Sequence, residues 1–200
     1  MNSDPVIKKN FFKLNSIFET QHIIFDPINP LSREDAELIL NLRSRQSGNF
    51  LRQTSGGINE QLEYLQSYGV RNKLHQEIYF KLKDKQKDSF NGVVRLTNLN
   101  DEETFNWESL VFDENCTPIA PIDVMITIYK IGFEILKRKK CGPWDVDKRH
   151  ERMMKIHEFC KMYSIDSEDK QYFHISVSME SYFANINRFN KLGLGRINWI

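Results

Sequence analysis

The chain has 200 residues, a length that suits one domain with a substantial core. Apolar residues make up 40% of the sequence and charged residues 28%, which is typical of a globular protein and excludes a disordered or fibrous chain. The 28 Lys and Arg residues are nearly balanced by 27 Asp and Glu residues. This balance argues against a general nucleic-acid binder, whose affinity depends on many cationic contacts with phosphates.

The sequence predicts neither a membrane span nor export. Its most apolar stretch, residues 124–133, is short and contains a Lys, whereas a spanning helix needs about 20 residues. Residues 1–16 contain no apolar segment followed by a small-residue cleavage site, so we expect a cytoplasmic protein. The three cysteines, Cys116, Cys141 and Cys160, are then expected to be reduced thiols.

The first half of the chain predicts an irregular arm and the start of one domain. We expect the arm over residues 1–20 and a single domain over residues 21–200. Residues 22–28 are β-branched and aromatic and contain a proline near their end, which favours a first strand. Ser32 is a suitable N-cap for a helix that follows, and residues 58–68 carry the spacing of a second amphipathic helix.

The pattern then changes to alternating apolar and polar residues, which is typical of strands. Residues 77–83, 93–98 and 104–112 form three such segments, and their short polar connections favour antiparallel pairing. The clearest helical pattern follows at 122–138, and the basic run that closes it suits the C-terminal end of a helix dipole.

The remaining elements complete an α/β order. Residues 141–147 predict a strand, 150–163 a helix and 171–179 another strand, followed by a weaker helical pattern. The sequence therefore predicts a mixed, mostly antiparallel central sheet flanked by helices, in the order β-α-α-β-β-β-α-β-α-β.

This order and several segments resemble the GNAT family of acyl-coenzyme A-dependent N-acyltransferases. The similarity covers about residues 20–185 and is greatest to a bacterial branch that acetylates amino groups on nucleotide-linked sugars of surface polysaccharides. It implies a GNAT-like fold, acetyl-CoA as co-substrate and a small-molecule amine as acceptor, and it leaves a homodimer open. The segments that carry it are DAELILNLRSR, FLRQTS, NEQLEYLQSY, EIYFKL, NGVVRLTNL, Trp107–Ser109, Thr117–Pro118, Asp145–Val146 and His157.

The resemblance also implies where acetyl-CoA binds. A helix N-terminus favours phosphate, and backbone N–H groups of a strand can hold a thioester carbonyl. The family's Gly-rich pyrophosphate loop is absent before the 122–138 helix, and capping the first helical turn is an alternative role for Asp123. The residues expected to bind the co-substrate are Leu110, Val111, Phe112, Thr117, Ile119, Ala120, Ile122, Asp123 and His150.

Two residues are candidates for catalysis. Glu108 lies on the strand face opposite Trp107, Ser109 and Val111, where its carboxylate could take a proton from the acceptor amine. The alternative is a solvated strand position, which the usual exposure of Glu favours. His157 is expected to protonate the departing thiolate, because it occupies the place of the family's proton donor and an anionic neighbour would raise its pKa. The alternative is a buried core histidine.

Three residues are candidates for binding the acceptor. Arg43 interrupts the apolar face of its helix and could bind a diphosphate, although a surface ion pair would explain it equally. Asn106 shares the strand face of Glu108. Trp107 either stacks on a sugar or packs in the core, and its type favours the core.

No metal site is expected. Cys141, His150, His157 and Cys160 are residue types that bind zinc, but their spacing matches no common zinc pattern. Two other functions stay open: acetylation of another small amine, such as an amino acid or antibiotic, and a GNAT-like binding domain without activity. The missing glycine loop suggests the second.

Overall fold

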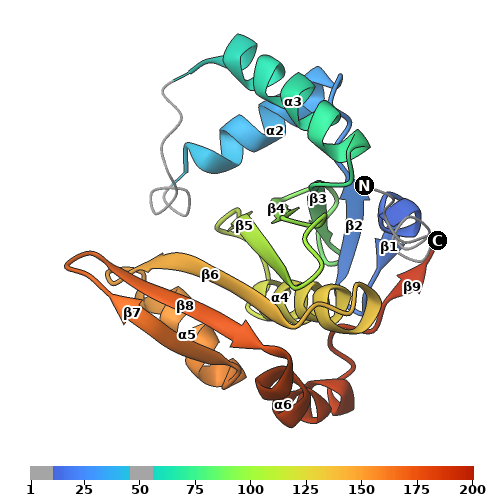
Figure 1. Ribbon diagram of the computed structural model, residues 1–200. Helices are drawn as coiled ribbons and strands as arrows, with labels where there is room; N and C mark the ends of the chain where they lie inside the picture. The colour runs from blue at the N-terminus through green and yellow to red at the C-terminus, as the bar shows by residue number, and fades with distance from the viewer. Residues whose placement is uncertain (1–10, 46–55) are drawn as a thin grey trace.

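The computed structural model describes residues 11–45 and 56–200. In this part of the chain, nine strands form one sheet in the order β7-β8-β6-β5-β4-β3-β2-β1-β9 (Figure 1). Neighbouring strands run antiparallel except for the pair β5–β6, which is parallel. The strands are β1 (Phe18–Glu19), β2 (Ile23–Pro27), β3 (Ile78–Asp84), β4 (Gly92–Thr97), β5 (Thr104–Phe112), β6 (Lys140–Asp147), β7 (Tyr163–Glu168), β8 (Tyr172–Ser178) and β9 (Asn198–Trp199).

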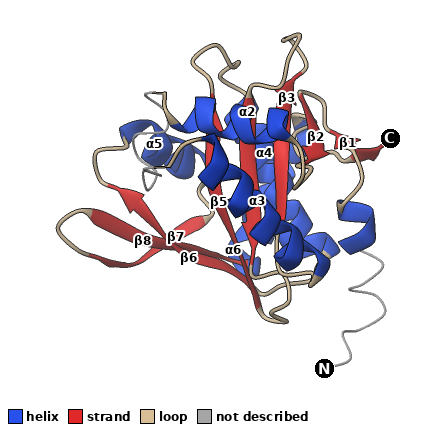
Figure 2. Ribbon diagram, turned by 90° about the horizontal axis from the view of Figure 1, so that it is seen from above, coloured by secondary structure: helices blue, strands red, loops and turns tan. Residues whose placement is uncertain are grey.

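Helices cover both faces of the sheet (Figures 1 and 2). One face of β2–β5 packs against α2 and α3, and α4 lies on the other. The helices are α2 (Arg33–Arg43), α3 (Ile58–Lys73), α4 (Ala120–Lys130), α5 (Glu151–Cys160) and α6 (Met179–Lys191), and a π-helical turn (Ile131–Ile135) extends α4. None of the helices in the described ranges is long and apolar enough to cross a membrane.

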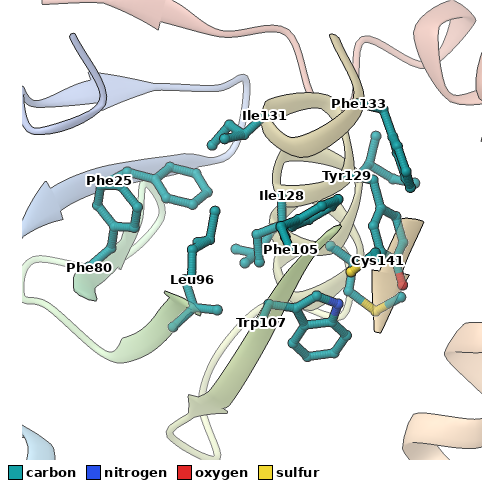
Figure 3. Packing of buried hydrophobic residues seen from close by; sticks show 14 of the residues in the cluster. Phe25, Phe80, Leu96, Phe105, Trp107, Ile128, Tyr129, Ile131, Phe133 and Cys141 are labelled. Carbon is teal, nitrogen blue, oxygen red and sulfur yellow. The ribbon is translucent and has the colours of Figure 1, made fainter. Parts of the chain in front are cut away.

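The core consists of two apolar clusters, one on each face. The larger cluster lies between the sheet and α4, where Phe25, Phe80 and Phe105 pack with Ile128 (Figure 3). The smaller cluster lies under α2 and α3 and includes Tyr79. The mixed α/β fold predicted from the sequence is confirmed.

Local sequence signals account for most of the elements. The Ser32 hydroxyl caps α2 by accepting a hydrogen bond from the Asp35 N–H at 3.1 Å, as expected. The alternation at 104–112 gives β5 with the same bounds.

Two local expectations are wrong. The basic run 137–140 does not end a helix, because helical backbone stops at Ile135, and Arg138 is buried and donates to the Leu99 carbonyl at 2.8 Å. Residues 11–20 are not an irregular arm, since they contain a helical turn, β1 and core side chains. Residues 1–10 and the segment FLRQTS lie outside the described residues.

Candidate active site

The strands β5 and β6 begin as a parallel pair and then separate (Figure 1). Along these two fully described strands, registered pairing ends at Phe105 and Cys141. At the point of separation, which we call the fork, the Asn106 side-chain oxygen accepts a hydrogen bond from the Gly142 N–H at 2.9 Å. Beyond the fork, the edge of β5 that faces β6 is open to an extended ligand that pairs as a further strand.

A β-bulge follows the fork in β5. Val93 pairs with Val111 but Arg95 pairs with Glu108, so two residues of β5 stand opposite one residue of β4. Ser109 lies in this bulge with φ of 57°. The bulge reverses the inward and outward alternation, because Val111 packs under α2 and α3 whereas Trp107 packs toward α4. The expectation that Ser109 and Val111 share the face of Trp107 is therefore wrong.

The bulge lines a cavity of about 450 Å³ between α2, α3 and the sheet. Its walls combine two guanidinium groups, an amide, a carboxylate, a hydroxyl and two tyrosine rings. The lining residues are Ile39, Leu40, Arg43, Gly56, Gly57, Glu60, Gln61, Tyr64, Tyr79, Arg95 and Ser109.

Arg95 is the centre of a charged network on the sheet side of the cavity. Its guanidinium donates to the Tyr64 hydroxyl and to the Glu108 carboxylate, and it lies 3.9 Å from a Glu77 oxygen. Glu77 is buried and also pairs with Arg71 at 3.0 Å. Burial alone would lower the pKa of Arg95, but the surrounding tyrosine and carboxylates outweigh it and raise the pKa.

The structure brings two of the predicted site residues to this region. Arg43 lines the cavity and approaches the Ser109 hydroxyl at 3.4 Å, so it belongs to the site and not to a plain surface position. Glu108 lies beside the cavity with its side chain 46% exposed. Its carboxylate is held by Arg95 and by the Thr97 hydroxyl at 3.4 Å, so it is not simply solvated.

Two predicted acceptor-binding residues have structural roles instead. The Asn106 oxygen is engaged by Gly142 at the fork. Trp107 is 5% exposed and packs beside Trp144, with ring centroids 5.3 Å apart, on the α4 side of the sheet. The acceptor assignments of Asn106 and Trp107 are corrected, and the core interpretation of Trp107 is confirmed.

His157 lies on the same side of the sheet as Trp107. Its ring packs against Trp107, Trp144 and Tyr163, with centroids 6.2, 5.8 and 5.7 Å away. The side chain is almost fully buried, and burial, followed by repulsion from His150, lowers the pKa of His157 to about 4. The expected imidazolium near neutral pH is therefore wrong, because at pH 7 the ring is neutral.

This burial predicts a pH-dependent loss of stability. The unfolded state binds a proton at His157 near pH 6.5 but the folded state only near pH 4, so stability falls as the pH drops through this window. At about 1.4 kcal/mol per pKa unit the total is about 3 kcal/mol. The free energy of unfolding, measured with urea, should fall less between pH 7 and pH 4.5 in His157→Phe than in the wild type. Equal pH effects in the two proteins would contradict this.

The predicted phosphate site at the start of α4 is largely occupied by the protein itself. The N–H and hydroxyl of Thr117 both donate to Asp84, each at 2.7 Å. The N–H groups of Ala120 and Asp123 donate to the carbonyls of Thr117 and Ile119. The prediction that backbone N–H groups here bind phosphate is therefore wrong for three residues, Thr117, Ala120 and Asp123.

Asp123 itself is a buried structural residue. Its carboxylate is fully buried and accepts hydrogen bonds from the Thr20 hydroxyl at 2.6 Å, the Gly195 N–H at 2.8 Å and the His22 N–H at 3.3 Å. It ties α4 to segments near both ends of the chain. The sequence suggests two roles for Asp123, binding of the co-substrate and capping of the helix. Both are wrong, because its carboxylate is buried and bonded within the protein.

The start of α5 lies close to the loop that enters α4. His150 caps α5, with its Nδ1 accepting from the Met153 N–H at 3.4 Å, and burial lowers the pKa of His150. Arg152 interacts with the Cys116 thiol in the loop before α4. His150 therefore lies near the loop before α4. Both His150 and this loop are predicted from the sequence to bind the co-substrate.

The other expected co-substrate residues lie along the end of β5. Leu110 is half-buried at the bulge, and Val111 and Phe112 are buried on opposite faces of the sheet. Phe112 lies over Gly92, where even a Cβ would come within 2.5 Å of the ring. The side chains of Val111 and Phe112 are therefore part of the core, which leaves the backbone groups of these two residues to serve a ligand.

The sequence reasoning missed Gln61, Tyr64, Tyr79 and Arg95. Two signals were present. Gln61 falls on the apolar stripe of α3, with Ile58, Leu65 and Tyr68, and Arg95 interrupts an otherwise apolar strand. A polar residue in such a position has a partner or lines a cavity more often than it is merely buried.

The residues 11–45 and 56–200 contain no group of three or more His, Cys, Asp or Glu side chains placed to hold a metal ion. All three cysteines are free thiols, and burial raises the pKa of Cys141 and Cys160.

Comparisons with known proteins give two different results. No protein-family model and no curated protein sequence matches the chain. Solved structures do match. FdhC, described as a nucleotide-linked sugar GNAT, is 22% identical, with 90% of this chain and 99% of that chain covered and a TM-score of 0.76.

Two further structures contain coenzyme A ligands. The N-acetyltransferase PseH of Campylobacter jejuni, in complex with acetyl coenzyme A, is 20% identical over 78% of this chain and 98% of its own, with a TM-score of 0.59. The spermidine N-acetyltransferase of Vibrio cholerae, in complex with CoA and spermine, is 16% identical over 81% and 98%, with a TM-score of 0.63. The chain therefore has the GNAT fold.

Proposed function

We propose that the chain is an N-acetyltransferase that transfers the acetyl group of acetyl-CoA to the amine of a nucleotide-linked amino sugar, in the synthesis of surface polysaccharide. One arrangement carries the proposal: the bulged part of β5, just beyond the fork, lines the cavity under α2 and α3. An acyl donor paired with β5 would thus present its carbonyl beside a cavity large enough for an acceptor. The similarity to FdhC and PseH supports the same reaction.

The β5 edge suits the pantetheine arm of acetyl-CoA. An extended chain can add to a strand edge through backbone hydrogen bonds. Successive N–H groups of a strand point to opposite edges, so the proposed partners are those N–H groups of residues 110–112 that point toward β6 and not toward β4. At the start of α4, the proposed phosphate donors are the N–H groups of Ile119 and Ile122, which lie at the helix N-terminus. The bound co-substrate supplies the thioester, and the chain orients its carbonyl.

The charge of the cavity favours a sugar over a polyamine acceptor. Arg43 and Arg95 both line it, whereas Glu60 is the one carboxylate among its lining residues in the described part of the chain. A polycation such as spermidine would lie next to two guanidinium groups, and like charges repel. A sugar linked to a nucleotide offers hydroxyl and phosphate oxygens, which arginine binds well.

Glu108 is the proposed acceptor of the proton that the amine must lose. It is the carboxylate nearest in sequence to the bulge at Ser109, and Arg95 fixes its position. Glu108→Gln should lower kcat by about 10²–10³-fold, within the range for a lost general base, and remove the acidic limb of the pH–rate profile. Glu103→Gln, at an exposed carboxylate, is the control. An unchanged profile in Glu108→Gln would contradict the role.

A panel of acceptors tests the proposed function. Release of free thiol from acetyl-CoA is followed with UDP- and dTDP-linked amino sugars, free amino sugars, spermidine and amino acids. We expect turnover with at least one nucleotide-linked amino sugar at a kcat/KM at least 100-fold above that of the other amines. Faster turnover of spermidine or an amino acid would contradict the acceptor class. No binding of acetyl-CoA would instead favour a binding domain without activity.

A further inference from the structure

Gln61 presents an unusual amide to the cavity. It lies in the first turns of α3 and is only 5% exposed, yet it lines the cavity between α2, α3 and the sheet. Its backbone N–H donates to the Gly57 carbonyl at 3.2 Å. Its side-chain nitrogen, Nε2, is buried without a hydrogen-bond partner among the residues that the structure describes.

A buried amide donor without a partner costs stability, because it has lost its hydrogen bonds to water and gained none in return. An unpaired buried donor that lines a cavity therefore indicates a partner atom on a ligand. An oxygen atom of a ligand in the cavity would complete its hydrogen bonding, and a ligand without that oxygen would leave it unsatisfied.

The neighbours of Gln61 indicate what kind of oxygen this is. Glu60 also lines the cavity, and its carboxylate accepts from the Gly57 N–H at 2.9 Å at the N-terminus of α3. A negative charge at this end disfavours a phosphate. A carboxylate beside an amide suits a hydroxyl-bearing ring, since the carboxylate accepts from one hydroxyl and the amide donates to another oxygen.

The other walls fit the same ligand. Tyr64 and Tyr79 contribute aromatic rings, and Arg43 reaches the Ser109 hydroxyl on the bulge opposite. Polar groups therefore converge on one cavity from α2, α3 and β5, and aromatic surface lies between them.

We propose that Gln61 determines acceptor specificity: its Nε2 donates to a hydroxyl oxygen of the amino sugar, whose ring occupies the cavity while the nucleotide extends out of it. This inference rests on the proposed function and deepens it. It gives Gln61 a binding role and no part in the proton transfer.

The test compares Gln61→Leu with the wild type, using the nucleotide-linked amino sugar that the wild type acetylates fastest and its analogues with single ring hydroxyls replaced by hydrogen. Gln61→Leu should raise KM for the sugar about tenfold and leave KM for acetyl-CoA within twofold. With the wild type, one deoxy analogue should have a KM about tenfold above that of the parent sugar. With Gln61→Leu, this analogue and the parent sugar should have the same KM. Gln66→Leu, at an exposed position of the same helix, should match the wild type.

The melting temperature separates binding from a structural role. Leucine has a similar size and needs no partner, so Gln61→Leu should melt no lower than the wild type. An unchanged KM for the sugar, or a loss of activity in step with a lower melting temperature, would overturn the inference while the proposed function stands. If the wild type acetylates no amino sugar, the proposed function and this inference both fail.

Discussion

Arg95→Met is expected to lower the free energy of unfolding by about 3 kcal/mol, the lower end of the range for breaking a buried ion pair. The guanidinium side chain is 17% exposed and its loss leaves Glu77, which is 7% exposed, with Arg71 as its remaining cation. It also releases Tyr64, which lines the cavity from α3, and Glu108, which lies beside the cavity on β5. We therefore expect acetyl transfer to fall at least 100-fold, since small displacements of positioning groups are that costly.

Urea unfolding and turnover measure the two effects of this substitution. Lys139→Met is the matched control, because it removes an ion pair with Glu103 whose side chains are 70% and 60% exposed. Such a pair contributes less than about 1 kcal/mol. Equal stability of Arg95→Met and Lys139→Met would show that the network under the cavity is not held together by Arg95.

Gly142→Ala is expected to disrupt the fork. Gly142 has φ of +99°, a region that other residues adopt only under strain. A Cβ there would lie 2.6 Å from the Trp144 ring and 2.9 Å from the Ile175 carbonyl oxygen. We expect a loss of about 2–4 kcal/mol in stability, from backbone strain and overpacking together, and an acetyl-CoA Kd raised about tenfold.

Urea unfolding and calorimetric titration of acetyl-CoA measure these changes. Gly57→Ala provides the control, because Gly57 has a φ of −85° and a Cβ there would lie at an ordinary 3.7 Å from the Glu60 carboxylate. We expect that variant to lose about 1 kcal/mol or less. A Gly142→Ala protein with wild-type stability and wild-type affinity for acetyl-CoA would contradict the account of the fork.

The sequence predicted the fold well because local patterns encode its elements. The Ser32 cap, the apolar stripe of α3 and the alternation of 104–112 each require only neighbours within a few residues. Chain order then placed the elements in one sheet. The two-residue strands β1 and β9 were missed, because so few residues leave no period to detect. The edge strand β7 was also missed.

The site was predicted less well because it depends on contacts between distant segments. The bulge at Ser109 reverses the facing of the residues after it, and regular alternation gives no sign of this. Asp84, 33 residues away in sequence, accepts the hydrogen bonds of the Thr117 N–H and hydroxyl groups. The burial of His157 under Trp107 and Trp144 joins three elements, so its neutral state could not be inferred from its helix alone.

Hydrogen–deuterium exchange can show whether acetyl-CoA binds at the fork along β5. With saturating acetyl-CoA, we expect amide exchange in residues 106–112 to slow at least tenfold, because backbone N–H groups of this edge pair with the ligand. Exchange in β3, which is paired on both sides, should change much less. Unchanged exchange in residues 106–112 at millimolar acetyl-CoA, with the protein folded, would contradict binding at the fork.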